Sequence, residues 1–472
     1  MTLYNGVRLV DSPSPSNVLR LDMGCLPMVN YMNRVGIRVD IPHFRALNVK
    51  IDEAIEYKVA EIDYAIHDLV GHYVDPKTHG PFKVGSDDHV ARLLFDVLHV
   101  QGDSKVRLTD SGARQSTQDE VISIFQGKWP IITKILDHRE LKKLKTTYIE
   151  PIPSCVDSDG RMRTIFKHTR TRTGRLASGD KDEDLRNLQN IPVRSEWGKW
   201  IRNGFLASPG NVLVSGDLSQ AEMRWAAHLS GDPVMSKVFR DRLDVHNMTA
   251  CGIFKLNLAY YTDLAAKDER GNLSREEARV WKEFKHNYRL PSKTLGFGIL
   301  YGTTGQGLQT QIANAGGPWW EEEKCDQLIR DWFKVYQGIS DWMDEQHARA
   351  KRFGMVWDAF GRVRMAPGAR SAHSRFVNAA LREVGNMPVQ ASAQGSIKLA
   401  MAELWPISQF FNHSAGVCWP LLQIHDEVIT EVKREAAEDY AREKRRVMEG
   451  AVPLDVPVLS SSDIAERWGD LK

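Results

Sequence analysis

Two aspartates in this chain stand where carboxylates are commonly placed for metal-assisted chemistry. Asp217, in VLVSGDLSQAEMR, follows the apolar run Val212–Val214 and precedes a helix-like stretch, so it is predicted to lie at the end of a strand. Asp426 and its neighbour Glu427 interrupt the apolar sequence LLQIHDEVI, as polar residues do at the tip of a hairpin. Polar groups buried between apolar strand halves are costly unless they find partners, and a metal ion is one such partner.

A pair of carboxylates from separate segments suits phosphoryl-type transfer. That reaction uses two cations about 3.5–4 Å apart, which stabilise the attacking and the leaving oxygen. Mg²⁺ typically takes only one or two protein carboxylates and completes its shell with substrate phosphates. Asp217 and Asp426 together would meet this need. Taken singly, each is equally consistent with a structural aspartate in a turn.

A second set of chemically suggestive residues lies in HNYRLPSKTLGFGILYG. Arg289, Lys293, Phe297 and Tyr301 recur every fourth position, so on a helix they form one stripe that drifts by about 40° per step. A nucleoside triphosphate has a matching layout, because its phosphates would meet the two cations and its sugar and base would meet Phe297. An amphipathic helix with a cationic face and aromatic core residues would show the same pattern.

The start and the glycines of this helix add to the prediction. Proline is tolerated in the first turn of a helix, so the helix is predicted to begin near Leu290–Pro291. Both cations would then lie at its positive end, where backbone N–H groups favour phosphate. Gly296, Gly298 and Gly302 are poor helix formers, and they are expected where a nucleotide or template strand comes close to the backbone.

The elements that must position these residues alternate in type along the chain. A length of 472 residues is too great for one compact core, so about two to four subdomains are expected. The predicted order begins with a polar, Pro/Ser-rich arm (1–18) and mostly helical sequence to about Tyr148. Short strands and loops (161–230), a helical region (231–385), and a mixed region with a helix at Gln394–Leu404 follow. Loop signals fall at Asp110–Gly112 and Pro151–Gly160. This order predicts a β core whose sequence is split by a helical insertion.

Composition and charge narrow the class of protein. The chain is 42% hydrophobic and 26% charged, as globular proteins are, and its net charge of +2 does not mark a nucleic-acid binder. Residues 161–202 carry 11 Lys/Arg against 5 Asp/Glu, which suits a surface facing phosphates and equally an ordinary solvated face. The five cysteines are too far apart for a zinc site or a disulfide scaffold. The sequence shows no signal peptide and no apolar stretch near the membrane-spanning length, so a cytosolic compartment is expected.

Taken together, these segments resemble the family A (bacterial polymerase I-type) DNA polymerases. DLSQAEMR (Asp217–Arg224) is similar to the family's motif A, RLPSKTLGFGILYG (Arg289–Gly302) to motif B, RxxxKxxxFGxxYG, and QIHDEV (Gln423–Val428) to motif C. Further similar segments occur in the family's order over about residues 20–470: RELKKLKTTY (Arg139–Tyr148), TGRLAS (Thr173–Ser178), NLQNIPVR (Asn187–Arg194), DVHNMTA (Asp244–Ala250) and LREVGNMPVQASAQGSIKLAM (Leu381–Met401). Each motif is weak alone, but the ordered set is specific.

The resemblance implies an α+β, right-hand polymerase fold with an antiparallel-sheet palm, helical fingers and a helical thumb. The implied parts are an N-terminal arm (1–18), the thumb (19–150), a first part of the palm with motif A (151–230), the fingers with motif B (231–385, with an insertion at about 255–284) and a second part of the palm with motif C (386–472). The implied activity is that of a template-directed DNA polymerase in DNA replication, which adds dNMP from dNTPs to a primer 3′-OH on primer-template DNA. The implied cofactor is Mg²⁺, two ions, for which Mn²⁺ can substitute.

The resemblance also assigns roles to individual residues. The metal ligands would be Asp217, Asp426 and the carbonyl of Leu218, with Glu427 accessory and Lys293 a general acid toward pyrophosphate. The nucleotide would contact Arg289, Lys293, His246, Phe297, Tyr301, Gln220 and Glu222, the last of which would exclude a 2′-hydroxyl. DNA would contact Arg175, Asn187, Gln189, Asn190, Asn386, Gln390, Gln423 and His425, together with Lys142, Lys143 and Lys145 of the thumb. Family members with Phe at the position of Phe297 reject dideoxynucleotides, and those with Tyr accept them.

The chain departs from the family pattern in three places. Leu218 replaces the usual Tyr of motif A. From His246 to Arg289 the sequence advances 43 positions, more than the family pattern, and the excess (about Lys255–Phe284) is charged and helix-like. The resemblance begins at Leu26–Asp40, so no proofreading exonuclease domain is expected before the thumb. A separate exonuclease or a processivity factor is then an expected partner. A phage-like enzyme is expected, which would work in the host cytoplasm.

Three competing functions use parts of the same pattern. A single-subunit RNA polymerase shares the palm and the motif order, but Glu222 and the RxxxKxxxFGxxYG pattern argue against it. A non-catalytic DNA-binding protein with a polymerase fold would not need intact Asp217, Asp426, Arg289 and Lys293. A metal nuclease also uses paired carboxylates, but it has no use for a helix that binds a triphosphate.

Overall fold

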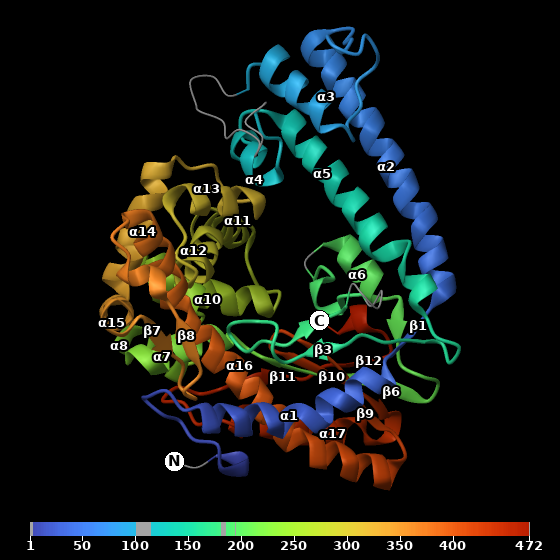
Figure 1. Ribbon diagram of the computed structural model, residues 1–472. Helices are drawn as coiled ribbons and strands as arrows, with labels where there is room; N and C mark the ends of the chain where they lie inside the picture. The colour runs from blue at the N-terminus through green and yellow to red at the C-terminus, as the bar shows by residue number, and fades with distance from the viewer. Residues whose placement is uncertain (1–2, 101–114, 181–185, 194, 472) are drawn as a thin grey trace.

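The computed structural model of the chain describes residues 3–100, 115–180, 186–193 and 195–471. Figure 1 shows a β-sheet region near the base, a thick layer of helices at one end of it, and two long helices, α2 (Ile41–Val70) and α5 (Pro130–Leu144), that rise from the other end. The loop expected at Asp110–Gly112 lies outside the described residues. Within the described ranges, no helix is both long and apolar enough to cross a lipid bilayer.

The central sheet is antiparallel and joins segments that are about 200 positions apart in the chain. Its strands, in spatial order, are β11 (Ser460–Ser461), β6 (Asn211–Leu218), β10 (Glu427–Lys433) and β9 (Cys418–Ile424), and β12 (Ile464–Ala465) also pairs with β6. Nearly every residue of β6 and β10 is buried, so both faces of these strands are covered. The strand predicted around Val212–Val214 and the hairpin predicted around Asp426 are confirmed.

The helix α16 is much longer than the sequence predicts. It runs from Ser374 to Ala415 and includes Pro388 and Pro406, whereas the prediction was a helix at Gln394–Leu404. An interior proline costs about 3 kcal/mol, but nearly every residue from Val384 to Leu404 is buried, and tertiary packing of this extent outweighs the local penalty. The expected boundary between residues 385 and 386 therefore falls inside one continuous helix.

The N-terminal residues are docked on the body of the protein, and they do not form the free arm that a polar, Pro/Ser-rich sequence predicts. Val7 is fully buried, the Val10 N–H donates to the Ala359 carbonyl (2.8 Å), and the Ser14 N–H donates to the Gly361 carbonyl (3.0 Å). The following helix, α1 (Pro15–Val35), packs against α16 and β9 near the sheet, as Figure 1 shows, and its neighbours are not α2 and α5.

The pair formed by α2 and α5 has a hydrophobic core of its own at its far end. Ile62 and Ile66 of α2 and Ile132 of α5 pack there against Leu93 and Leu94. The last two residues belong to the turn that follows α3 (Asp87–Ala91), and α4 (Asp119–Ile122) lies in the same cluster region. This satellite core stabilises the tip of a unit that would otherwise be only a two-helix hairpin.

The helical layer is built from nine helices and one small hairpin among the described residues. The helices are α7 (Ala221–Ser230), α8 (Pro233–Arg240), α9 (Val245–Phe254), α10 (Leu258–Glu269), α11 (Arg275–Phe284), α12 (Leu290–Leu300), α13 (Gly305–Asn314), α14 (Glu322–Val335) and α15 (Gln337–Phe353), and the hairpin is β7 (Met355–Trp357) with β8 (Val363–Met365). The helical character of this region was predicted, but the hairpin that interrupts it was not.

Small strands attach the loop region between residues 151 and 210 to the rest of the chain. They form a three-stranded sheet of β2 (Arg161–Met162), β1 (Ile37–Val39) and β5 (Phe205–Leu206), and a two-stranded sheet of β3 (Phe166–Lys167) and β4 (Ala177–Ser178). The helix α6 (Glu196–Arg202) follows.

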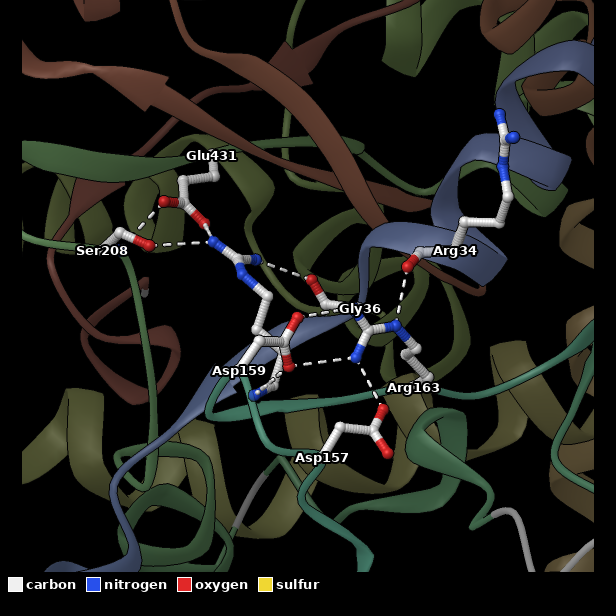
Figure 2. A network of polar contacts seen from close by, with 8 residues as sticks. Arg34, Gly36, Asp157, Asp159, Arg163, Ser208 and Glu431 are labelled. Atoms are coloured by element: carbon white, nitrogen blue, oxygen red, sulfur yellow. Dashed lines mark hydrogen bonds and ion pairs between the residues drawn. The ribbon is translucent and has the colours of Figure 1, made fainter.

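A polar network fixes these small strands to the far end of β10 (Figure 2). The guanidinium of Arg161 donates to the carboxylate of Glu431 (2.8 Å), to the Gly36 carbonyl (2.8 Å) and to the hydroxyl of Ser208 (2.8 Å). Glu431 is fully buried, and it also accepts bonds from Asn211 and from the Ser208 N–H. Removing one partner would leave a buried charge unpaired, so the network acts as one unit.

Beside it, Arg163 donates to Asp157 and Asp159 (2.6 Å each) and to the Arg34 carbonyl (2.7 Å), which closes the turn between them (Figure 2).

A buried lysine joins the two strands that carry the candidate catalytic aspartates. The ammonium of Lys444, on α17 (Ala437–Gly450), donates to the carbonyls of Val214 on β6 (2.9 Å) and Val428 on β10 (2.6 Å). Gly216 makes room for it, because a Cβ at this position would lie 2.9 Å from Cε of Lys444. Burial lowers the pKa of Lys444 to about 7, although the nearby charge of Glu427 opposes the shift.

Lys444 predicts a pH dependence of stability. Between about pH 7 and pH 10 the unfolded chain binds a proton that the folded chain lacks, because the ordinary lysine pKa is about 10.4. The free energy of unfolding should therefore rise with pH in this window. The variant Lys444→Met has no such group, so wild type should gain stability relative to it between pH 7 and pH 10.

Urea unfolding of both proteins at several pH values measures this difference. Lys237→Met, which changes an exposed lysine on α8, is the matched control and should follow wild type. Parallel curves for wild type and Lys444→Met would show that Lys444 keeps an ordinary pKa.

Candidate active site

The pairing of β6 with β10 brings the predicted carboxylates together. Asp217 lies directly opposite Glu427 in the antiparallel register, and the Leu218 N–H donates to the Asp426 carbonyl (3.1 Å). Asp217 and Leu218 end β6, and Asp426 occupies the turn between β9 and β10. The structure therefore brings the two predicted segments together at one end of the sheet.

The backbone beside each aspartate adopts a conformation that is uncommon for residues other than glycine. His425, next to Asp426, has φ of 53°, and Gln220, three residues after Asp217, has φ of 54°. Left-handed backbone of this kind costs of order 1 kcal/mol or more and tends to cluster at functional sites. Here it directs the chain sharply at the ends of both strands, so that the two segments converge.

The electrostatics of the site are those of crowded negative charge. Burial, together with the charges of Glu222 and Asp217, raises the pKa of Asp426 to about 7, and the charge of Arg175 opposes the shift. Burial also lowers the pKa of the neighbouring His425, and the charge of Arg175 contributes. A bound cation would reverse the penalty on the carboxylates, since opposite charge favours the ionised form.

The donor set fits a hard divalent cation. Two aspartates and the backbone carbonyl of Leu218 are all oxygen donors, which Mg²⁺ and Mn²⁺ prefer. In the part of the chain that the structure describes, no group of three or more His, Cys, Asp and Glu side chains gathers in a metal-binding arrangement. Two aspartates and one carbonyl would fill only part of the shell of two cations, and the remaining positions would be left to substrate oxygens.

Glu222 is the centre of a hydrogen-bond network at the other side of the site. Its carboxylate accepts bonds from the Arg175 guanidinium and from the Tyr301 hydroxyl (3.0 and 3.1 Å to the two oxygens). The Gln390 amide donates in turn to the Tyr301 hydroxyl (3.1 Å). The network joins α7, the end of α12, α16 and the segment before β4. All four residues were candidates from the sequence, but their spacing gave no sign that they bond to one another.

The cationic helix differs from the prediction at its start. α12 begins at Leu290 as expected, but helical backbone continues before it through a π-type turn at Lys285–Arg289 into α11. The Leu290 N–H donates to the Lys285 carbonyl, so Arg289 and Lys293 do not lie at a free, positive helix end. The wider turn accommodates Pro291, which lacks an N–H. Phosphate affinity at this place must come from the side chains.

The predicted triphosphate residues do come together. The rings of His246 and Phe297 lie 5.5 Å apart, and burial together with the charges of Arg289 and Lys293 holds the pKa of His246 below its usual range, while Asp244 opposes the shift. Arg289 donates to Asn247 (2.8 Å) and Asp244 (2.6 Å).

Sequence reasoning missed the two residues that hold Arg289. Asp244 also caps α9 by accepting the N–H groups of His246 and Asn247. An Asp at the start of a helix is a recognisable N-cap signal, and this signal could have pointed to Asp244.

Two of the three glycines in motif B have reasons within the protein. A Cβ at Gly298 would lie 2.9 Å from the Gln311 side chain, and Gly302 has φ of 66°, where a side chain is strained. Only Gly296 has open space, since a Cβ there would meet no atom closer than 3.7 Å. Gly298 and Gly302 are thus required by the protein's own packing and backbone, and close approach of a ligand to these glycines stays a prediction.

The predicted DNA-contacting residues lie on both sides of the carboxylates. Gln189 donates to the side chain and carbonyl of Gln423 (3.1 Å each), and Gln423 donates to the His425 carbonyl. A cavity of about 640 Å³ beside Tyr301 is lined by Asn386, whose buried side-chain oxygen has no hydrogen-bond partner in the structure. This orphaned acceptor marks a place where a ligand could donate.

The remaining predicted DNA-contacting residues are more varied. Asn187 caps the short turn that follows it, and the Asn190 carbonyl accepts a bond from the Tyr148 hydroxyl (2.7 Å). Lys142 and Lys143 are exposed at the end of α5. Lys145 differs from them, because it forms ion pairs with Asp52 and Glu150.

Known proteins share this arrangement of sequence and fold. The model of DNA polymerase family A matches residues 46–470 of the chain. The chain belongs to DNA polymerase family A. It has the right-hand fold of that family, with an antiparallel sheet between two helical parts.

Individual relatives give the extent of the similarity. The thermostable DNA polymerase I of Thermus aquaticus is 34% identical over 439 residues, which cover 93% of this chain and 46% of the relative. DNA polymerase I of Deinococcus radiodurans is 32% identical over 93% of this chain and 40% of its own length. The chain thus spans less than half the length of these relatives.

Among solved structures, the POL domain of Pol1 from M. smegmatis, in complex with DNA primer-template and dNTP, is similar with a TM-score of 0.75. It is 26% identical, and the match covers 96% of this chain and 73% of that one.

Proposed function

We propose that this chain is a template-directed DNA polymerase that adds dNMP to a primer 3′-OH and releases pyrophosphate, in DNA replication. The observation that carries the proposal is the meeting of two elements around one site. One is the β6–β10 pair with Asp217 and Asp426. The other is the helical rod that carries Arg289 and Lys293, whose end at Tyr301 bonds to Glu222, and the charge of Glu222 in turn acts on Asp426. Carboxylates for cations and cations for a triphosphate are both needed for this reaction, and neither alone identifies it.

We assign the parts of the right hand as follows. The palm is the central sheet with α1, α16 and α17, since α1 packs against α16 and β9. The thumb is the unit of α2 and α5 with its satellite core, and the fingers are the helical layer from α8 to β8. The expected start of the thumb at residue 19 therefore moves to about residue 40, and the C-terminal part of α16 belongs to the palm.

In the proposed mechanism Asp217, Asp426 and the Leu218 carbonyl would hold two Mg²⁺ ions, or Mn²⁺ in their place. Such ions would supply activation of the attacking hydroxyl and charge stabilisation for the leaving oxygen. Glu427 lies opposite Asp217 and adds to the negative potential of the site. His425, at the strained turn, would approach the primer end.

The fingers residues would hold the nucleotide. Arg289, oriented by Asp244 and Asn247, would bind the triphosphate together with His246. Lys293 would bind it as well and donate a proton to the leaving pyrophosphate.

The palm side would test the new base pair. Arg175, Gln390 and Asn386 would contact the minor groove, where purine N3 and pyrimidine O2 are common to all pairs. Gln220 and Glu222 would lie beside the sugar. The partners we propose are primer-template DNA and dNTPs, and the compartment is the cytoplasm, where both are found.

The test of the proposal removes each candidate metal ligand. Asp217→Ala and Asp426→Ala should each slow primer extension by about 10²–10³-fold or more, because charge developing in the transition state loses its stabilisation. Binding of primer-template DNA should stay within a few-fold of wild type, since the metals and not these side chains meet the phosphates.

Single-turnover extension and DNA-binding titrations measure the two effects. Asp344→Ala, which changes an exposed aspartate on α15, is the matched control and should behave as wild type. Extension at a near-normal rate by either active-site variant would refute the two-metal assignment.

Glu222 is proposed to exclude ribonucleotides. Glu222→Ala should lower the preference for dNTP over rNTP by at least about tenfold, because the space under C2′ opens. Tyr301→Phe is the matched control, since it removes one hydrogen bond to Glu222 and keeps the carboxylate. Steady-state incorporation of both nucleotide types by the three proteins measures the preference. If Glu222→Ala discriminates as well as wild type, the barrier to the 2′-hydroxyl lies elsewhere.

Phe297 is proposed to make the enzyme reject dideoxynucleotides. It follows Lys293 by one turn and contacts His246, and it has no hydroxyl to replace a missing 3′-OH on the incoming sugar. Phe297→Tyr should therefore reduce the preference for dNTP over ddNTP by at least about 10²-fold, as a single polar contact can. Chain termination in ddNTP/dNTP mixtures measures it, with Phe353→Tyr on α15 as the control. An unchanged ratio would mean that Phe297 does not face the sugar.

A further inference from the structure

The helices α10 and α11, which the sequence marks as an insertion, form an appendage with a core of its own. Tyr261 stacks on Phe284 with ring centroids 4.0 Å apart, and Trp281 stacks on the same ring at 5.4 Å. Leu264 is fully buried among them, and the cluster is anchored on α9 through Cys251. A capping box of Ser274 and Glu277 fixes the start of α11. The appendage is thus a built element that holds α11 rigidly.

Several acidic side chains of the appendage are neutralised on its inner side. Lys267 forms ion pairs with Asp263 (2.9 Å) and Glu277 (2.7 Å). Asp268 accepts a bond from the Trp281 indole (2.6 Å) and pairs with Lys285 (3.1 Å).

The outer face of α11 is different, because it carries one sign of charge. Arg275, Arg279 and Lys282 lie within about 60° of one another around the helix axis, on the side opposite Trp281 and Phe284. All three are exposed, and among the described residues none of them makes an ion pair or a hydrogen bond through its side chain. We call these three residues the basic stripe.

The surroundings of the stripe leave it cationic. His286 continues the same line, and the exposed acids of α11, Glu276 and Glu283, lie on its flank about 60–100° away from the line. A solvated helix face usually mixes charges at i and i+4, whereas this line is basic over three successive turns.

The dimensions of the stripe favour a polynucleotide over a nucleoside triphosphate. Because α11 and α12 are one continuous helix, Arg275 lies about 21 Å along the axis from Arg289. A triphosphate held at Arg289 and Lys293 cannot span that distance. A DNA strand carries a phosphate about every 3.4 Å of helix axis and can follow it.

The position of the stripe agrees with this partner. Figure 1 shows α10 and α11 on the side of the helical layer nearer to α5 and α6. The end of α5 presents the exposed Lys142 and Lys143, which are the proposed thumb contacts to DNA.

We propose that Arg275, Arg279 and Lys282 form a binding surface for the phosphate backbone of the primer-template DNA. The inference rests on the proposed function, because it takes DNA as the substrate. The insertion would lengthen the cationic helix of the fingers, so that one rigid rod carries both the nucleotide cations and a DNA contact. The stripe reads no sequence, since phosphates are the same at every step.

The test uses the salt dependence of DNA binding. The full chain with Arg275→Gln, Arg279→Gln and Lys282→Gln together is compared with wild type on one primer-template, from about 50 to 200 mM salt. Each lost phosphate contact should lower the slope of log K against log salt by about 0.7–0.9. The triple variant should therefore lose a slope of about 2–3, and its affinity at low salt should fall by at least tenfold.

The matched control neutralises three exposed arginines of α17 on the other side of the sheet. Arg442→Gln, Arg445→Gln and Arg446→Gln change the net charge equally and remove only weak surface ion pairs, so this variant should keep the wild-type slope. Circular dichroism checks that both variants stay folded, which their exposure favours.

An equal slope for the stripe variant and wild type would overturn the inference. If a raised KM for dNTP accompanied the equal slope, the stripe would be assigned to the nucleotide. This result would leave the proposed function intact, since wild type would still extend the primer. Failure of the wild-type protein to extend a primer would refute the proposed function by itself.

Discussion

The antiparallel pairing of β6 with β10 is the constraint on which the rest of the molecule depends. It sets Asp217 opposite Glu427 and bonds Leu218 to Asp426, so several negative groups meet where the strands end. Burying a carboxylate among like charges is unfavourable. The pKa of Asp426 is raised first by its burial and then by the charges of Glu222 and Asp217. The protein bears this cost because the rest of both strands is bound firmly. Lys444 joins their carbonyls from one side, and the Arg161–Glu431 network holds the far end of β10.

The proposed nucleotide side of the site is held by the two ends of α12. At its start Arg289 is bonded to Asp244 and Asn247, and at its end Tyr301 is bonded to Glu222. These contacts join the helix to α9 and α7, so its face is set against the palm by polar bonds and not only by packing. Such bonds exchange readily for bonds to a ligand, because their groups are partly exposed and their net contribution is modest. The network is therefore well suited to a site that must accept and release substrates.

The continuous helix from α11 to α12 gives the insertion a mechanical connection to the site. If a loop joined the two inserted helices to the fingers, they would form a separate surface protrusion. Here the π-type turn at Lys285–Arg289 keeps the backbone helical past Pro291. The helices α11 and α12 therefore form one continuous rod that ends at the site. The aromatic core of Tyr261, Trp281 and Phe284 gives that rod a stiff support.

Much of the site could be predicted from the sequence, because its residues lie in short, locally legible patterns. An aspartate after an apolar run, an HDE triplet inside another, and cations at spacings of four are properties of neighbouring residues. Asp217 lies at the end of a strand and Asp426 in a turn, as predicted, whereas Arg289 and Lys293 lie within a longer helical rod and not at its start. The β core split by a helical insertion also followed from the order of periodicities, and the resemblance to family A implied the α+β, right-hand fold. The resemblance to family A joined these pieces before any contact between them was known.

Only the tertiary structure decided how far elements extend and what each polar group bonds to. Local propensity ends α16 near its prolines, but burial along its length carries it from Ser374 to Ala415. A polar N-terminal segment looks like a free arm, yet Val7 is buried on the body of the protein. The bonds of Glu222 to Arg175 and Tyr301, and the lysine beneath Gly216, join residues far apart in the chain. No spacing rule reaches over such separations, because these partners become neighbours only when the hydrophobic core has formed.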